Sequence, residues 1–112
     1  MKLIVGGFAS GKRAYAKAHF PQEVKDGLLI DGLHLLIKQA LKRGEDTDAY
    51  VSQLIQDHPD AVILCDEIGL GIVPIDPFER AWREAVGRAC CRIAQEAQTV
   101  IRVICGLGQV LK

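Results

Sequence analysis

The sequence has no excess of either charge, because 14 lysine and arginine residues balance 14 aspartate and glutamate residues. A chain without a bulk positive field has no general means of holding a polyanion, so we expect no nucleic-acid partner. No apolar run approaches the roughly 18 residues that span a bilayer, and Gly6 interrupts the apolar start of the chain. We therefore expect no membrane span, no signal peptide and a cytoplasmic location.

The four cysteines lack the spacing of a metal site, since no C-x-x-C pair occurs. Cys90 and Cys91 are adjacent and would point about 100° apart on a helix. Cys65 and Cys105 lie in apolar runs typical of strands. Disulfide partners and metal ligands are the alternatives, but we expect four reduced, buried packing residues.

The 112 residues are 49% hydrophobic and 25% charged, the length and composition of one packed domain. Apolar runs predict strands at 2–5, 27–31, 61–65 and 100–105, with a short edge strand at 109–111. Helical spacing of apolar residues predicts helices over 12–20, 33–41, 47–57 and 77–97. We expect Asp46 and Asp76 to cap the last two helices and Pro21 to end the first.

Strands that alternate with helices pair in parallel through right-handed crossovers. The sequence therefore predicts an α/β fold in three layers, with a mostly parallel sheet of about four to five strands. We expect residues 1–112 to form this single domain.

A glycine-rich segment follows the first predicted strand and matches G-x-x-x-x-G-K in the strand–loop–helix context of a phosphate-binding loop. Backbone N–H groups of such a loop surround a phosphate, and its lysine reaches the outer phosphates. An ordinary glycine-rich turn is the alternative, and the context favours the phosphate loop. The predicted nucleotide-binding residues are Gly6, Gly7, Phe8, Ala9, Ser10, Gly11, Lys12 and Arg13.

Arg13 departs from this motif, whose next residue is a serine or threonine that ligates Mg²⁺. A guanidinium group has no lone pair to offer a cation. Mg²⁺ would then be held by carboxylates and water alone, which weakens its binding. Ser10 is a poor substitute for the missing hydroxyl because it precedes Gly11.

Carboxylates follow two other predicted strands, Asp31 after the second and Asp66 with Glu67 after the third. Parallel strands bring these ends to the edge that carries the glycine-rich loop. We predict Asp31 and Asp66 as ligands of Mg²⁺, and Lys12, Asp31 and Glu67 as catalytic residues that neutralise charge or orient a hydroxyl. Asp31 is alternatively a turn residue or a helix cap. His34 is better explained as a histidine of the capping region than as a functional residue.

The segment 67–74 is apolar yet interrupted by glycines, which indicates a shaped wall rather than a solvated connection. An ordinary crossover loop is the alternative. We predict that Gly69, Gly71, Val73 and Pro74 contact a large substrate.

Three segments resemble the cobinamide kinase family, the bifunctional adenosylcobinamide kinases and adenosylcobinamide-phosphate guanylyltransferases of cobalamin biosynthesis. They are residues 4–12, the stretch DEIGLGIVP at 66–74, which is similar to N-E-V-G-x-G-I-V-P, and CGLGQVLK at 105–112. The resemblance implies a P-loop NTPase-like fold, a homo-oligomer, GTP or ATP as the nucleotide and the corrinoid cobinamide as the acceptor. It thus implies nucleotide-dependent phosphoryl transfer.

The sequence departs from this family between Phe20 and Asp31, where the family carries the histidine that becomes guanylylated and this chain has none. The resemblance therefore implies the kinase half of the activity more directly than the guanylyltransferase half. The alternative is a non-catalytic nucleotide- or corrinoid-binding protein that partners or regulates an enzyme of the same pathway.

Overall fold

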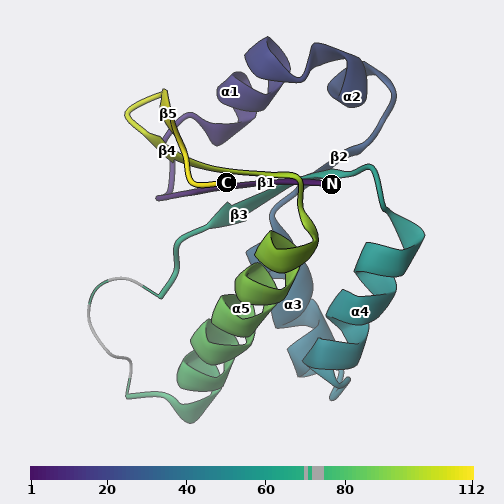
Figure 1. The fold of residues 1–112 in the computed structure, drawn as a ribbon. Helices are drawn as coiled ribbons and strands as arrows, with labels where there is room; N and C mark the ends of the chain where they lie inside the picture. The colour runs from purple at the N-terminus through teal and green to yellow at the C-terminus, as the bar shows by residue number, and fades with distance from the viewer. Residues whose placement is uncertain (70, 72–74) are drawn as a thin grey trace.

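The computed structural model describes residues 1–69, 71 and 75–112, which fold into strands and helices in an alternating order (Figure 1). In chain order the elements are β1 (Lys2–Gly6), α1 (Lys12–His19), α2 (Pro21–Lys25), β2 (Leu29–Asp31), α3 (Leu33–Lys42), α4 (Thr47–Asp57), β3 (Val62–Asp66), α5 (Pro77–Glu96), β4 (Thr99–Ile104) and β5 (Leu107–Val110).

The strands form one open sheet in the order β2-β3-β1-β4-β5. The first four run parallel, and β5 returns antiparallel to β4. Gly6 at the end of β1 is level with Asp66 at the end of β3. The prediction of a mostly parallel sheet of four to five strands is confirmed, and the carboxyl ends of its parallel strands meet at one edge.

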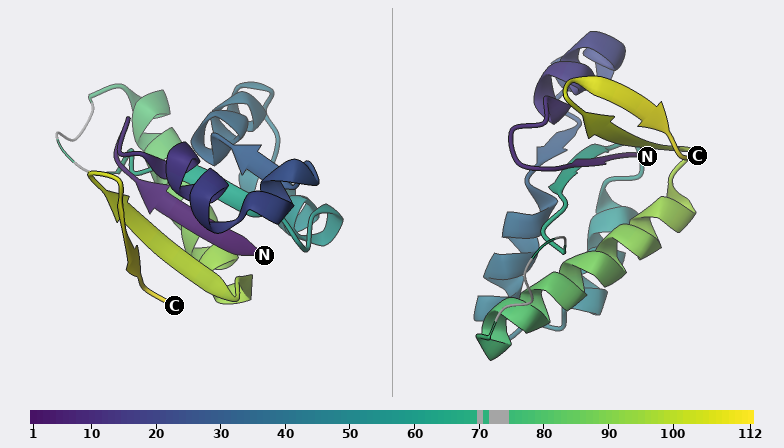
Figure 2. Two further views of the ribbon diagram at one scale, coloured as in Figure 1. Left: turned by 90° about the horizontal axis from the view of Figure 1, so that it is seen from above. Right: turned by 90° about the vertical axis from the view of Figure 1, so that its left-hand side faces the viewer.

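Helices cover both faces of the sheet, as Figures 1 and 2 show: α1 and α2 on one side, α3, α4 and α5 on the other. Successive strand residues point to opposite faces, so Leu3 and Ile63 pack in the core under α3 and α5, while Ile4 and Leu64 pack in the core with α1. The continuous apolar runs follow from this burial on both faces. The predicted three-layer arrangement is confirmed.

The helix starts agree with the sequence. The Asp46 carboxylate accepts hydrogen bonds from the N–H groups of Asp48 and Ala49 at 3.0 and 3.3 Å. Asp76 accepts one from Phe78 at 2.9 Å, with Pro77 as the first residue of α5. Both predicted caps are confirmed.

The helix α2 was not predicted. Pro21 does stand beyond the end of α1, but it also begins the short second helix. Proline is well placed at a first helical position, because its missing N–H would have no helical partner there.

The expectation of four buried cysteines is wrong for two of them. Cys65 is buried and Cys90 half-buried, with their Sγ atoms 3.6 Å apart. Cys91 and Cys105 are exposed. Cys105 lies in the turn between β4 and β5 with a φ of 51°, so its apolar surroundings in the sequence belong to the hairpin and not to the core.

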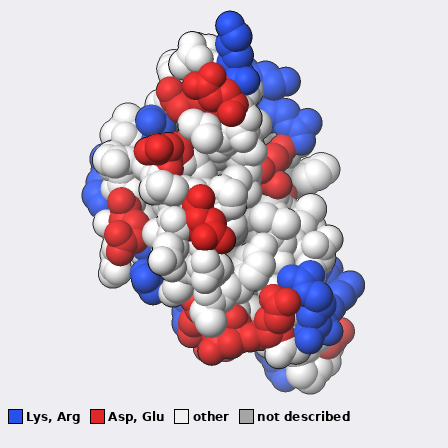
Figure 3. All heavy atoms as spheres, turned by 90° about the vertical axis from the view of Figure 1, so that its right-hand side faces the viewer, with Lys and Arg blue, Asp and Glu red and all other residues white. Residues whose placement is uncertain are grey.

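Acidic and basic side chains are intermixed on the face shown in Figure 3, and neither sign covers it. Ion pairs join successive turns of α5, where Arg88 contacts Glu84 at 3.1 Å and Arg92 contacts Glu96 at 4.0 Å. Among the helices described, none combines the length and apolar character needed to cross a membrane.

Candidate functional site

The glycine loop, residues 6–12, joins β1 to α1 at the carboxyl edge of the sheet. A Cβ atom on Gly6 would lie 2.6 Å from both the Ser10 hydroxyl and the Val103 carbonyl oxygen, so only glycine fits there. Gly11 has a φ of 96° and directly precedes α1. The Ser10 carbonyl accepts a hydrogen bond from the N–H of Gly106 at 2.8 Å, which ties the loop to the β4–β5 turn. The sequence thus forms a tight turn that presents the first N–H groups of α1 to the edge.

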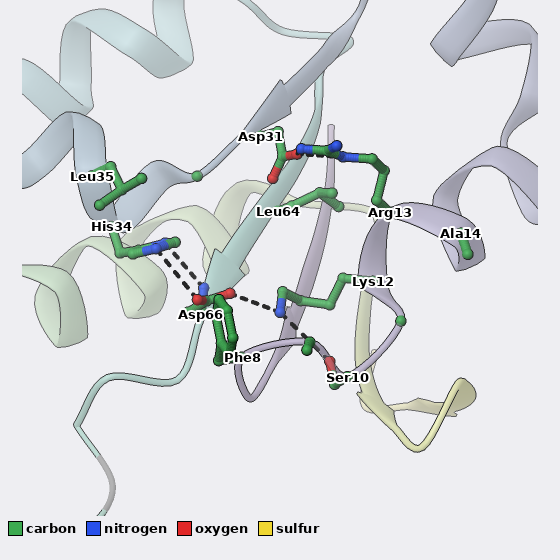
Figure 4. A pocket seen from close by; sticks show the side chains of 13 residues that line it. Phe8, Ser10, Lys12, Arg13, Ala14, Asp31, His34, Leu35, Leu64 and Asp66 are labelled. Atoms are coloured by element: carbon green, nitrogen blue, oxygen red, sulfur yellow. Dashed lines mark hydrogen bonds and ion pairs between the residues drawn. The ribbon is translucent and has the colours of Figure 1, made fainter.

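Lys12 turns its side chain into this loop and is only 7% exposed. Its Nζ donates to the Gly7 carbonyl at 2.7 Å and lies 2.7 Å from Asp66 Oδ1 and 3.5 Å from Ser10 Oγ (Figure 4). A buried ammonium group needs such partners. The loop therefore holds one positive charge within its own curve, beside the end of β3.

His34, on the first turn of α3, contacts the other side of Asp66. Its Nδ1 accepts a hydrogen bond from the Asp66 N–H at 3.2 Å, and its Nε2 lies 3.4 Å from Asp66 Oδ2. Burial lowers the pKa of His34, and the Asp66 carboxylate opposes this only in part. The imidazole is therefore neutral at pH 7, with the accepting Nδ1 bare and the proton on Nε2 facing the carboxylate.

Trp82 of α5 fixes the backbone of this histidine, because its Nε1–H donates to the His34 carbonyl at 2.7 Å. His34 thus belongs to a chain that runs from Lys12 through Asp66 to the imidazole. Sequence reasoning favoured a capping-region histidine over this role, because a histidine near a helix start has no distinguishing spacing.

Arg13, the residue after the lysine, pairs with Asp31 at the end of β2. Its Nε donates to Asp31 Oδ2 at 2.7 Å, and its Nη2 contacts the same oxygen. The pair is more exposed than the Lys12–Asp66 pair, with the arginine side chain 66% exposed. Arg13 and Asp31, both predicted as site residues, therefore lie at the same edge of the sheet and form an ion pair with each other.

These two pairs line one cleft of about 570 Å³ (Figure 4). Its wall consists of residues 8–14 from the loop and α1, and, from the other elements, Asp31, Gly32, His34, Leu35, Leu64 and Asp66. The structure thus brings residues 8–13 of the predicted nucleotide-binding segment together with Asp31 and Asp66, whereas Gly6 and Gly7 do not line this cleft. Phe8 projects from the loop into solvent, 91% exposed.

Glu67 lies outside this cleft, on the other side of the glycine loop. Its Oε1 is 2.9 Å from Nε of Arg102, and its Oε2 accepts from Nη2 at 3.2 Å. Both side chains line a second cleft of about 400 Å³, which is also lined by residues 7–10 of the loop and continues to Cys105. Arg102 was missed in the sequence, although a lone charge inside the apolar run of β4 was a signal for it.

The residues of the first cleft do not form a ligand set for Mg²⁺. Position 13 offers a guanidinium in place of a hydroxyl, Asp31 is paired with that arginine, and Asp66 is paired with Lys12. In the described parts of the chain, no three histidine, cysteine, aspartate or glutamate side chains gather as a metal site. The predicted ligands Asp31 and Asp66 each face a cation of the protein instead.

The predicted substrate wall is only partly described. Gly69 lines a cavity of about 320 Å³ together with Glu67 and Cys90. Gly71 is exposed, with a φ of 102°. Val73 and Pro74 lie outside the described residues.

A comparison with protein families finds a match that covers most of the chain. The family is described as cobinamide kinase / cobinamide phosphate guanyltransferase, and the match spans residues 18–111. It includes Asp31, Asp66 and Glu67 and begins after the glycine loop. No curated protein matches the chain.

Proposed function

The chain belongs to the cobinamide kinase / cobinamide phosphate guanyltransferase family of cobalamin biosynthesis, and we propose that it is a kinase that transfers a phosphoryl group from a nucleoside triphosphate to a cobinamide hydroxyl. The observation that carries this proposal is the buried ammonium of Lys12 inside the curve of the glycine loop, at the start of α1. Free N–H groups at a helix start and a fixed cation together favour a phosphate chain.

The charge of Lys12 is available to the transferring phosphoryl group. Phosphoryl transfer depends on positioning and on neutralising charge around the transferring oxygens. Lys12 is held by a carboxylate and a carbonyl, and a γ-phosphate would take the place of the carbonyl contact. Asp66 would keep the ammonium in the loop during transfer.

The acceptor hydroxyl would approach from the second cleft, which shares residues 8–10 with the first. A phosphate held by the loop is thereby reached from two sides, as an in-line displacement requires. Glu67 is the carboxylate on the acceptor side, and Arg102 orients it. Its role in this proposal is to orient the hydroxyl and accept its proton.

We propose the kinase activity of the family for this chain, and not the guanylyltransferase activity. The family's guanylylated histidine would lie between Phe20 and Asp31, and that segment, which includes α2, has no histidine. We further propose a homo-oligomer, as the resemblance implies, and the role in cobalamin biosynthesis supports the expected cytoplasmic location.

The test is turnover of adenosylcobinamide with ATP and with GTP, in parallel with titration calorimetry for nucleotide binding. We expect adenosylcobinamide phosphate as the product and a loss of about 100-fold or more in rate for Lys12→Ala. Lys17→Ala is the matched control, because Lys17 is an exposed lysine on the same helix. Equal rates for the two variants would refute the assigned role of the loop.

A second candidate is the non-catalytic nucleotide-binding partner, which the pairing of Arg13 with Asp31 favours. This pairing occupies a carboxylate predicted for catalysis. The second candidate predicts nucleotide binding that is lost in Lys12→Ala, without phosphorylation of cobinamide at any nucleotide concentration.

A further inference from the structure

Arg13 stands where the motif of a phosphate-binding loop has the hydroxyl ligand of Mg²⁺. It lines the same cleft as Lys12, from the next position on α1. The cleft therefore contains two protein cations, each paired with a carboxylate, and a ligand of the cleft can meet the Arg13 guanidinium as well as the Lys12 ammonium.

Among the described residues, Asp31 is the hydrogen-bond partner of Arg13, and it engages only part of the guanidinium group. A guanidinium group has five N–H donors. In this structure Nε and Nη2 contact a single oxygen, Asp31 Oδ2. The other donors, including both on Nη1, are directed away from that oxygen, and the side chain is 66% exposed at the cleft. A fork of this kind suits a phosphate, which accepts two parallel hydrogen bonds from it.

The carboxylates of the cleft are already compensated. Lys12 lies 2.7 Å from Asp66 Oδ1, and the Arg13 guanidinium contacts Asp31. A divalent cation that bound either carboxylate would have to approach a fixed positive charge at close range. The electrostatic arrangement thus disfavours the ion that the motif ordinarily recruits.

We propose that Arg13 supplies a second positive charge, after that of Lys12, to the phosphate chain of the nucleotide. The protein would then bind the metal-free nucleoside triphosphate at least as well as its magnesium complex. This inference rests on the proposed nucleotide site. Asp31 holds the guanidinium at the cleft through one oxygen and leaves the remaining N–H groups for phosphate oxygens. The ligand is therefore the metal-free nucleoside triphosphate. In excess Mg²⁺ most of the nucleoside triphosphate is present as its magnesium complex instead.

The experiment is titration calorimetry of the full chain with ATP and with GTP, each in excess Mg²⁺ and in EDTA. For the wild-type chain we expect a Kd in EDTA equal to that in Mg²⁺ within about threefold, or lower. Arg13→Ser restores the motif's hydroxyl and releases Asp31, so its Kd should be about tenfold or more higher in EDTA than in Mg²⁺. Arg43→Ser is the matched control, because Arg43 is an exposed arginine paired with a carboxylate, Glu45, at the end of α3.

The outcomes separate this inference from the proposed function. Binding by the wild-type chain that strengthens more than about threefold with Mg²⁺ overturns the inference and leaves the nucleotide site standing. Binding of neither nucleotide under either condition overturns both. The comparison of the wild-type chain in Mg²⁺ and in EDTA decides the matter even if Arg13→Ser fails to fold.

Discussion

Removing the charge of Lys12 should destabilise the fold as well as abolish nucleotide binding. The Nζ–Oδ1 distance of 2.7 Å to Asp66 corresponds to an attraction of about 6 kcal/mol at an effective dielectric constant of about 20. Most of this offsets the cost of desolvating an ammonium group that is only 7% exposed. Lys12→Met leaves the Asp66 carboxylate without its cation. Because that side chain is 21% exposed, we expect a loss of about 2–3 kcal/mol, below the full cost of a buried unpaired charge.

A double-mutant cycle isolates the pair. Lys12→Met, Asp66→Asn and the double variant would be compared by urea unfolding, followed by the fluorescence of Trp82. The double variant should be less destabilised than the sum of the two single variants, with a coupling of about 1–3 kcal/mol. A coupling below about 0.5 kcal/mol would refute our reasoning, because it would mean that the two charges do not depend on one another in the folded chain.

Three further predictions concern the loop, the histidine and the thiols. Gly6→Ala places a methyl group 2.6 Å from a carbonyl oxygen of β4 and should cost about 1–3 kcal/mol; unchanged urea midpoints would contradict it. Burial lowers the pKa of His34 below its ordinary 6.5, so the unfolded chain binds more protons as the pH drops through about 6.5, and the folded chain loses stability there. His34→Asn, whose amide oxygen can replace Nδ1 as acceptor, should flatten this slope in unfolding measured from pH 7.5 to 5, and a slope equal to wild type would oppose the assignment. A thiol reagent should react quickly with the exposed Cys91 and Cys105 and slowly with the buried Cys65; a fast phase that survives Cys91→Ser/Cys105→Ser would be the contrary result.

The strands and the capped helices could be predicted because their signals are local. The apolar run 61–65 is buried on both faces, and an aspartate at position 46 or 76 has its N–H partners within three residues. The helix α2 was missed because a proline can end one helix and begin another, and the sequence does not distinguish the two.

The partners within the site could not be predicted from the sequence, because they depend on which strand ends are level. Asp66 and Glu67 are adjacent, yet of the two only Asp66 lines the first cleft and only Glu67 lines the second, on either side of the glycine loop. Alternation along a strand separates neighbouring side chains, but the first cleft also needs α1, β2 and α3 for its walls, and the second needs β4. The pairing of Glu67 with Arg102 joins two residues 35 positions apart, and only the sheet order brings them together.

The register of the sheet explains why the two ion pairs of the cleft remain separate. Gly6 is level with Asp66, whereas Asp31 is level with Leu64. Asp31 therefore lies two residues, roughly 7 Å along the strands, behind Asp66. Lys12 takes the nearer carboxylate, and a residue at position 13 needs a long side chain to reach the farther one. A serine there would end at its hydroxyl and leave Asp31 at the cleft without a cation. The arginine at position 13 and the aspartate at position 31 thus belong to one arrangement, in which a fixed guanidinium compensates the carboxylate that a metal ion would otherwise meet.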